Sequence, residues 1–89
     1  MGKESRPVEM ISVCSTEGKL MPVRFRFENG AHEIQIAHIL EIVCTKDICY
    51  VGVEAILYVC KVRVAEREHL LELKYMVQTH RWVLFREIY

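Results

Sequence analysis

The stretch Pro22–Ile36 reads PVRFRFENGAHEIQI, and it decides the fold that we predict for this chain. Apolar residues stand at alternate positions on both sides of Asn29–Gly30. An Asn-Gly pair between two such runs is the strongest short-range signal for a β-hairpin. With Asn29 and Gly30 as the central turn residues, Glu28 faces Ala31, and a slip of one residue would reverse the two faces. One face of this hairpin is then apolar: Val23, Phe25, Phe27, Ile34 and Ile36. The other face is polar: Arg24, Arg26, Glu33 and Gln35.

Strand patterns also lie on both sides of this hairpin. Before it, Pro7–Thr16 predicts a first strand and Glu17–Gly18 predicts a turn. After it the alternation continues, although Ile39 and Val43 add apolar residues to the opposite face. One helical turn is an alternative for this segment, because its apolar residues also match helical spacing. We favour a long, bent strand with a β-bulge near residues 37–39, since a bulge would explain the change of phase.

The middle of the chain predicts two further strands. Thr45–Asp47 is interpreted as a polar turn that leads into a short β-branched and aromatic run at Ile48–Val53. Ala55–Val64 alternates strongly, and Glu66–His69 is interpreted as a charged connection after it. The apolar face expected for this strand is Tyr58, Cys60, Val62 and Val64.

Two interpretations stay open for Leu70–Gln78. Its residues are good helix formers, but its apolar residues also stand at alternate positions, as in a strand. We favour the strand, in which Val64 would face Leu71. The last segment, Arg81–Tyr89, includes the run Trp82–Phe85, which is apolar on both faces, as in a strand that is covered twice.

Together these segments predict an all-β, or mainly β, fold. Successive short strands joined by tight turns favour an antiparallel meander of five to six strands, closed into a small barrel or a folded sandwich. The fold leaves room for one short helix at residues 70–78. We expect residues 1–6 to form a flexible N-terminus and residues 7–89 to form a single β domain.

Composition points to a cytosolic protein with no strong long-range field. The 89 residues carry 12 basic and 12 acidic side chains, so the formal net charge is zero, and 52% of the residues are hydrophobic. A dedicated nucleic-acid or acidic-membrane binder normally shows a basic excess. The N-terminal run is polar and shows no secretory signal, and no apolar run is long enough for a membrane span. We therefore expect a cytoplasmic location, no membrane contact and four reduced cysteines.

Part of the chain resembles a group of uncharacterised small bacterial β-barrel-like proteins. The resemblance covers residues 22–89, where a Pro-Val-x-Phe strand beginning at Pro22 leads to a hairpin, and where Trp82 begins a closing Trp-x-Leu strand. In place of the aromatic residue that the group carries after its Val-Leu pair, this chain has Val43 and Cys44. Members occur in bacteria near DNA-repair genes, so the resemblance implies a link to DNA metabolism. It implies no catalytic residue.

The sequence contains no motif for catalysis or for a cofactor. Cys44 and Cys49 stand on either side of the expected turn at Thr45–Asp47, but zinc would need two further ligands and no Cys-x-x-Cys pair is present. A small buried hydrophobe is the more ordinary role of a cysteine. His32 falls opposite Phe27 in the expected register, where it would cap the core. There is no nucleophile elbow and no glycine-rich phosphate loop. We predict neither an enzyme nor a bound metal or cofactor.

Two surfaces are candidates for binding. A basic outer face would be formed by Arg24, Arg26, Lys61 and Arg63, and small barrels bind single strands with such faces, although interleaved glutamates favour a neutralised surface. A self-association patch would be formed by Trp82, Leu84, Ile39 and Val43, because a small core cannot cover both faces of every strand. We therefore predict a non-catalytic binding or assembly module that forms a homodimer and can take a protein partner. A nucleic-acid-associated factor is the alternative.

Overall fold

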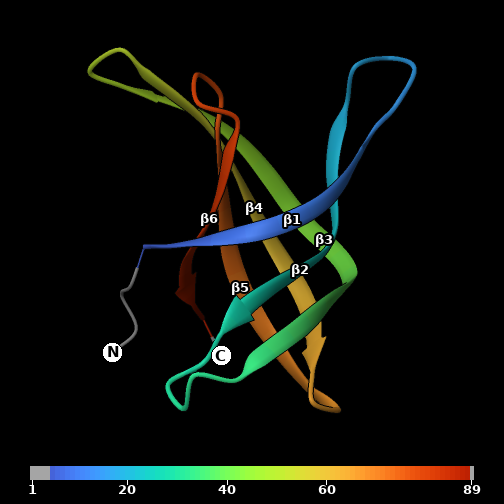
Figure 1. The fold of residues 1–89 in the computed structure, drawn as a ribbon. Helices are drawn as coiled ribbons and strands as arrows, with labels where there is room; N and C mark the ends of the chain where they lie inside the picture. The colour runs from blue at the N-terminus through green and yellow to red at the C-terminus, as the bar shows by residue number, and fades with distance from the viewer. Residues whose placement is uncertain (1–4, 89) are drawn as a thin grey trace.

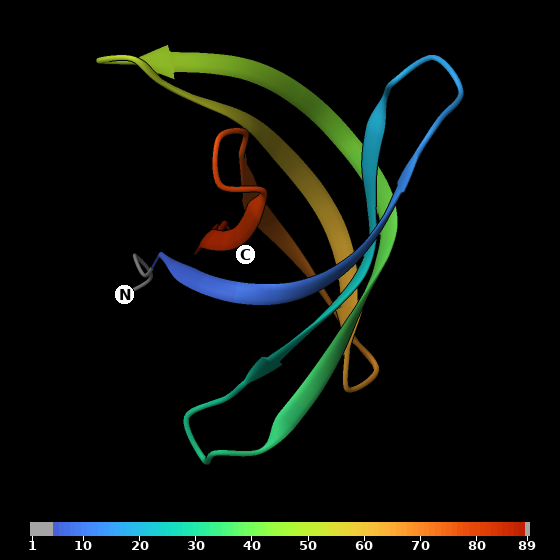
Figure 2. The same ribbon diagram turned by 45° about the horizontal axis from the view of Figure 1, so that its top comes forward.

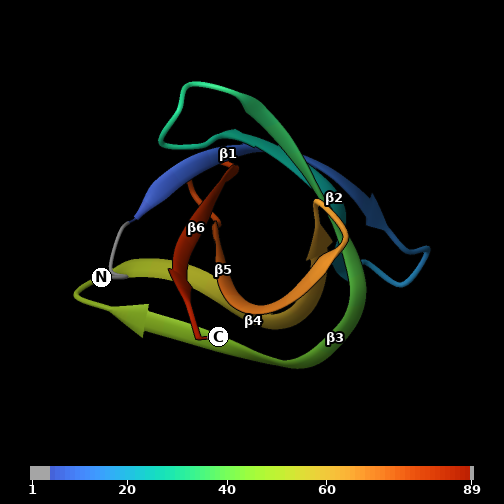
Figure 3. The ribbon, with the colours of Figure 1, turned by 90° about the horizontal axis from the view of Figure 1, so that it is seen from below.

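The computed structural model describes residues 5–88 and shows a closed antiparallel β-barrel (Figures 1 and 3). Every strand pairs with its neighbour in sequence, and the last strand pairs with the first, so the predicted meander is confirmed. The described residues contain no helix, and the strand interpretation of Leu70–Gln78 is correct through Met76. The six strands are β1 (Arg6–Cys14), β2 (Leu20–Glu28), β3 (Ile34–Tyr50), β4 (Val53–Val64), β5 (Arg67–Met76) and β6 (Arg81–Glu87).

The chain enters the barrel one residue earlier than expected. Arg6 was assigned to the flexible N-terminus, but it begins β1 and pairs with Leu84 of β6. Its guanidinium Nη1 also donates a hydrogen bond to the carbonyl of Glu28, at 2.8 Å. The rest of the predicted flexible segment, apart from Ser5, lies outside the described residues.

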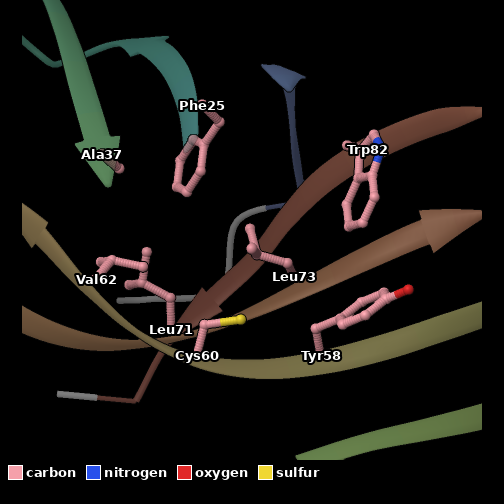
Figure 4. Packing of buried hydrophobic residues seen from close by; sticks show 8 residues of the cluster. All are labelled: Phe25, Ala37, Tyr58, Cys60, Val62, Leu71, Leu73 and Trp82. Carbon is pink, nitrogen blue, oxygen red and sulfur yellow. The ribbon is translucent and has the colours of Figure 1, made fainter. Parts of the chain in front are cut away.

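The core is a single cluster inside the barrel (Figure 4). The inward side chains of β4 are those that the alternation predicts, since Tyr58, Cys60 and Val62 are all buried. Tyr58 and Trp82 pack with their ring centroids 5.2 Å apart, and Trp82 lies 5.0 Å from Tyr75 in the same way. The buried cluster consists of Phe25, Ala37, Tyr58, Cys60, Val62, Leu71, Leu73 and Trp82.

The β2–β3 hairpin forms where it was predicted, but its register was wrong. Glu28 pairs with Ile34, not with Ala31, because residues 29–33 form a wider loop. In this loop the Asn29 side-chain oxygen accepts hydrogen bonds from the backbone amides of Ala31 and Glu33, at 2.9 and 3.0 Å. Asn29 therefore stabilises the wider loop with its side chain instead of occupying the centre of a two-residue turn.

The new register differs from the expected one by an odd number of residues, so it moves side chains to the other face. Phe25 and Phe27 still point inward, but Phe25 faces Ala37, and Ile34 and Ile36 are exposed. Val23 is also exposed, and it lies at a register shift between β1 and β2 where the described residues give it no pair. The predicted apolar face is therefore correct for the two phenylalanines only.

β3 is the long, bent strand that was predicted, with its irregularities at other residues. The register with β4 shifts at Leu40 and again at Val43, not at residues 37–39. Thr45–Asp47, expected to be a polar turn, continues the strand to Tyr50. β3 also changes its neighbour along its length: residues 34–38 pair with β2 and residues 38–50 pair with β4. Among the described strands, β3 is therefore paired on both sides only at His38.

Two-residue turns connect β3 to β4 and β4 to β5. Val51 and Gly52 both have positive φ, at 52° and 79°, and so do Ala65 and Glu66, at 52° and 65°. Positive φ at both central residues defines the type I′ turn of tight hairpins. The charged connection expected at Glu66–His69 is therefore wrong. Val64 pairs with Arg67 instead of Leu71.

Candidate strand-binding cleft

The wall of the barrel opens between β2 and β3 (Figure 2). Beyond the pair Arg24–His38, the β1–β2 hairpin and the β3–β4 hairpin separate and project from the body in different directions. A cleft of about 440 Å³ lies between them. Its lining residues are Gly18, Lys19, Leu20, Met21, Ile42, Cys44, Thr45, Asp47, Ile56 and Tyr58.

The cleft exposes the free edge of β3. In the described chain, residues 39–50 of β3 pair with β4 and with no other strand. The type I′ turn makes Tyr50 and Val53 a hydrogen-bonded pair, and such pairs alternate with non-bonded pairs along an antiparallel ladder. Counting back from Tyr50 along the regular register to Cys44 gives the residues whose backbone N–H and C=O groups point away from β4 into the open edge: Thr45, Asp47 and Cys49.

A hydrogen bond crosses the cleft. The Tyr58 hydroxyl, on β4, donates to the backbone carbonyl of Leu20 on β2, at 2.6 Å. A carbonyl that would bond to an adjacent strand in a continuous sheet is thus satisfied by a side chain. Burial raises the pKa of Tyr58 above its usual value, and the negative charge of Asp47 adds to the effect. The hydroxyl therefore stays protonated and remains a donor at neutral pH.

The cleft combines an apolar lining with two opposite charges. Leu20, Ile42 and Ile56 pack partly against the core cluster and present their remaining surface to the cleft. Lys19 and Asp47 supply one positive and one negative group beside this apolar surface. Such a lining suits an uncharged or mixed-charge segment with apolar side chains and shows no preference for a polyanion.

The predicted basic residues lie on the outer face of β2 and β4, as expected, but most of them are neutralised. Arg26 is bound to Glu9, with its Nη2 at 2.5 Å from the carboxylate. Lys61 lies 3.5 Å from Glu41. All four of these side chains are more than half exposed, so each pair contributes little to stability.

The remaining two predicted basic residues belong to one cross-strand row. Arg24 pairs in register with His38, and His38 pairs with Arg63, which lies 3.8 Å from the carboxylate of Glu68. Within residues 5–88, Arg24 and His38 form no ion pair. Sequence reasoning did not place His38 here, because the predicted register put Gln35 opposite Arg24.

The predicted self-association patch does not form on the surface. Trp82 is 7% exposed in the core, and Leu84 and Ile39 pack against the same cluster. Only Val43, at 48%, is exposed. On β6 the inward residues are Trp82 and Leu84, so Val83 and Phe85 are the outward ones. Phe85 is covered by Lys74, whose Nζ lies 3.9 Å from the ring centroid.

The histidines and cysteines do not gather into a metal site within residues 5–88. No three side chains of His, Cys, Asp or Glu come together there in a way that would hold a metal ion. Cys44 and Cys49 are exposed on β3, with no turn between them. His32 is 87% exposed beside Glu28, so its predicted place on the core is wrong.

A second, smaller hollow lies at the other end of the barrel. It has a volume of about 270 Å³ and an apolar floor that includes Phe27 and Leu71. His69 Nδ1 and a Glu87 carboxylate oxygen lie 2.7 Å apart at its rim. The Glu72 carboxylate, 7% exposed, accepts a hydrogen bond of 2.6 Å from Nε of Arg86. These polar groups are therefore engaged with one another.

Sequence reasoning missed the residues that line the cleft on the β3 side. Thr45 and Asp47 were placed in a turn because polar residues interrupt the apolar pattern there. The available signal was the Gly at position 52, which follows Val51 between two β-branched runs and fits a tight turn. Placing the turn at Val51–Gly52 would have extended the strand through Asp47.

A scan against models of protein families, a search of curated proteins and a search of solved structures each give no match to this chain. The resemblance to small bacterial β-barrel-like proteins therefore stays a prediction. In residues 5–88 we find no helix with the length and apolar character that crossing a membrane requires.

Proposed function

We propose that this protein is a non-catalytic binding and assembly module that captures an extended polypeptide segment along the free edge of β3. The observation that supports this most directly is the unpaired edge at Thr45, Asp47 and Cys49 beside an apolar cleft. Exposed strand edges are templates for pairing with another chain, and adding a strand to a sheet edge is a recurring mode of peptide recognition.

The cleft gives the captured strand a place for its side chains. A strand hydrogen-bonded to β3 would lie between β3 and the start of β2, at Leu20 and Met21. Every second side chain of that strand would then face Leu20, Met21 and Ile42. The preferred segment is therefore extended, with apolar residues at alternate positions and without proline at the bonded positions.

The proposal is tested with a labelled peptide about seven residues long, matched to the open edge, with valine and threonine in alternation. Fluorescence anisotropy at nanomolar protein should show saturable binding. Asp47→Pro should abolish it, because proline removes an outward amide without removing a bond to β4. The same peptide with N-methylated amides at alternate positions is the matched control and should bind poorly.

A peptide that fails to bind at up to about 1 mM, or that binds the Asp47→Pro variant equally well, would overturn the proposal. To remove dependence on one sequence, a phage-displayed library of random peptides is selected against the protein in parallel. Selected peptides should share alternating apolar positions, and their binding should be lost in Asp47→Pro.

The alternative, a nucleic-acid-associated factor linked to DNA metabolism, has one observation in its favour. Arg24 and His38 lie side by side on the outer face with no ion pair among the described residues. The pairs at Arg26, Lys61 and Arg63 weaken this alternative. A gel shift with short single- and double-stranded oligonucleotides at low salt tests it, and loss of binding in Arg24→Glu plus Arg26→Glu would support it.

A further inference from the structure

The β3–β4 hairpin ends in the most exposed apolar side chains of the described chain. Val51 is 83% exposed and Tyr50 is 79% exposed, and the neighbouring Val53 is half exposed. Val51 also has a φ of 52°, a left-handed conformation that β-branched residues rarely adopt and that Asn or Gly accommodates at lower cost. An apolar residue is thus kept at a position where both solvent and backbone disfavour it.

The corresponding turn between β4 and β5 has the same backbone geometry with different residues. Ala65 and Glu66 have φ values of 52° and 65°, but neither is a large apolar residue. Backbone geometry therefore does not require Val at position 51. Exposed apolar residues held in a strained turn point to a contact that the free chain does not make.

We infer that the strand captured by β3 is β3 of a second copy, in a two-fold symmetric dimer. This rests on the function proposed above and names its partner. An antiparallel pairing of two identical edges satisfies the same groups on both chains, so the interface closes with two copies. The chain has no net charge that would oppose this association.

The register of this pairing follows from the open edge. Within the regular register at residues 44–50, Thr45, Asp47 and Cys49 present bonding groups outward, and centring the two-fold axis on Asp47 uses all three of them. Asp47 then faces Asp47 of the second copy, and Thr45 faces Cys49. This register gives more hydrogen-bonded pairs than a displacement by two residues in either direction.

The same register brings the hairpin tip of one copy to the cleft of the other. With Asp47 on the axis, Tyr50 of the second copy lies opposite Cys44 on the outer face. The turn residue Val51 then comes beside the bulge at Val43, next to Ile42 of the cleft. Cys44 lines the cleft together with Leu20 and Met21. The exposed tip and the apolar cleft of one chain are therefore complementary surfaces. In the two-fold dimer the tip of each copy contacts the cleft of the other, so the contact occurs twice.

This arrangement predicts opposite effects of two substitutions at one position. Asp47→Pro removes an outward amide and should weaken dimerisation at least tenfold. Asp47→Asn removes a pair of like charges that face each other across the axis. It should tighten the dimer about two- to fivefold. Glu54→Gln, which removes a charge from the covered strand of the same hairpin, is the matched control and should have no effect.

Dimerisation is measured by light scattering and sedimentation equilibrium over a range of concentrations, where one chain has a mass of 10.5 kDa. A second measurement is disulfide trapping. In a background where Cys14, Cys44 and Cys49 are replaced by serine, Asp47→Cys should cross-link two copies on mild oxidation, whereas Glu54→Cys should not. Facing residues of a hydrogen-bonded antiparallel pair lie within disulfide range.

The outcomes separate this inference from the function on which it rests. A chain that stays monomeric but binds the labelled peptide through β3 removes the second copy and keeps the strand-binding function. A dimer that is unchanged by Asp47→Pro, or that gives no Asp47→Cys cross-link, also overturns the pairing. Absence of both dimerisation and peptide binding removes the two proposals together.

Discussion

The two parts of β3 have similar apolar content but different surroundings. Residues 34–38 pair with β2 and contribute Ala37, which is fully buried against Phe25. Among residues 5–88, residues 44–50 pair with β4 alone and contribute no residue to the buried cluster. Residues 34–38, the lower part of β3, therefore help to close the barrel. Residues 44–50, the upper part, present an edge. One strand can serve both purposes because its neighbour changes at His38.

The comparison of these two parts indicates that the exposure of side chains on β3 depends on the path of the neighbouring strand β2. Leu40 and Val43 are the residues at which the register with β4 shifts, and both are exposed. Bulges bend a strand and redirect side chains. These two bulges lie where β3 leaves β2, so they accompany the opening of the cleft.

The largest effect is expected at Phe25 of β2, which faces Ala37 in the lower part of β3. Phe25→Ala should lower the free energy of unfolding by about 3–5 kcal/mol, because it leaves a cavity beside Ala37 and Val62 in the core. Tyr50→Ala in the upper part should change it by less than about 0.5 kcal/mol, since Tyr50 is exposed. Urea denaturation of the dilute monomer measures both. Equal losses would contradict the division of β3 into a closing part and an edge.

A pH effect is expected at Cys60, which faces β3 through its pair with Ile42. Burial raises the pKa of the Cys60 thiol from 9.0 to about 12, and the neighbouring Cys44 adds to the rise. The folded state holds this proton more tightly than the unfolded state. The contribution of the protonated Cys60 thiol to the free energy of unfolding is therefore complete below pH 9, and it is lost as the pH rises towards 12.

In that interval the free energy of unfolding should fall by about 1.4 kcal/mol for each pH unit. Cys60→Val removes the titrating group, and its stability should depend less on pH between 9 and 10. Chemical denaturation at several pH values measures the slope. Identical slopes in the two proteins would show that the thiol titrates normally in the folded state.

A smaller effect is expected at the bond that crosses the cleft. Tyr58→Phe removes the donor to the Leu20 carbonyl and should cost about 1–2 kcal/mol. Exchange of the backbone amides should also accelerate in residues 20–23 of β2 and remain unchanged in residues 24–28, which pair with β3. Uniform acceleration along β2 would mean that the bond does not act on the open end in particular.

The smallest effect has the opposite sign. Val51→Asn creates an Asn-Gly pair at a type I′ turn and should raise the free energy of unfolding by roughly 1 kcal/mol. The same substitution at Ala65 is the control at the other tight turn and should also stabilise the chain. Only Val51→Asn should weaken dimerisation, as judged by sedimentation. If the Val51→Asn variant dimerises as tightly as the unchanged chain, the strained turn has no role in association.

The buried face of a strand could be predicted from sequence where apolar and polar residues alternate clearly along it. The alternation through Tyr58, Cys60 and Val62 specifies which face of β4 is buried, since successive side chains of a strand point to opposite sides. The same reasoning failed for β6, where Trp82 to Phe85 are apolar on both faces. With no polar residue to mark the outer face, parity there was set by pairing with β1 and β5.

The candidate site could not be predicted, because no local pattern specifies an open edge. The sequence by itself determined an all-β chain, its approximate strands and the inner face of β4. The wide loop at Asn29 and the two-residue turn at Val51–Gly52 rest on local interactions and local backbone conformation. Tertiary structure decided the change of neighbour of β3 at His38. In the part of the chain that the structure describes, no strand pairs with the outward amide of Asp47, because β2 diverges from β3. That divergence depends on how six strands close around one core.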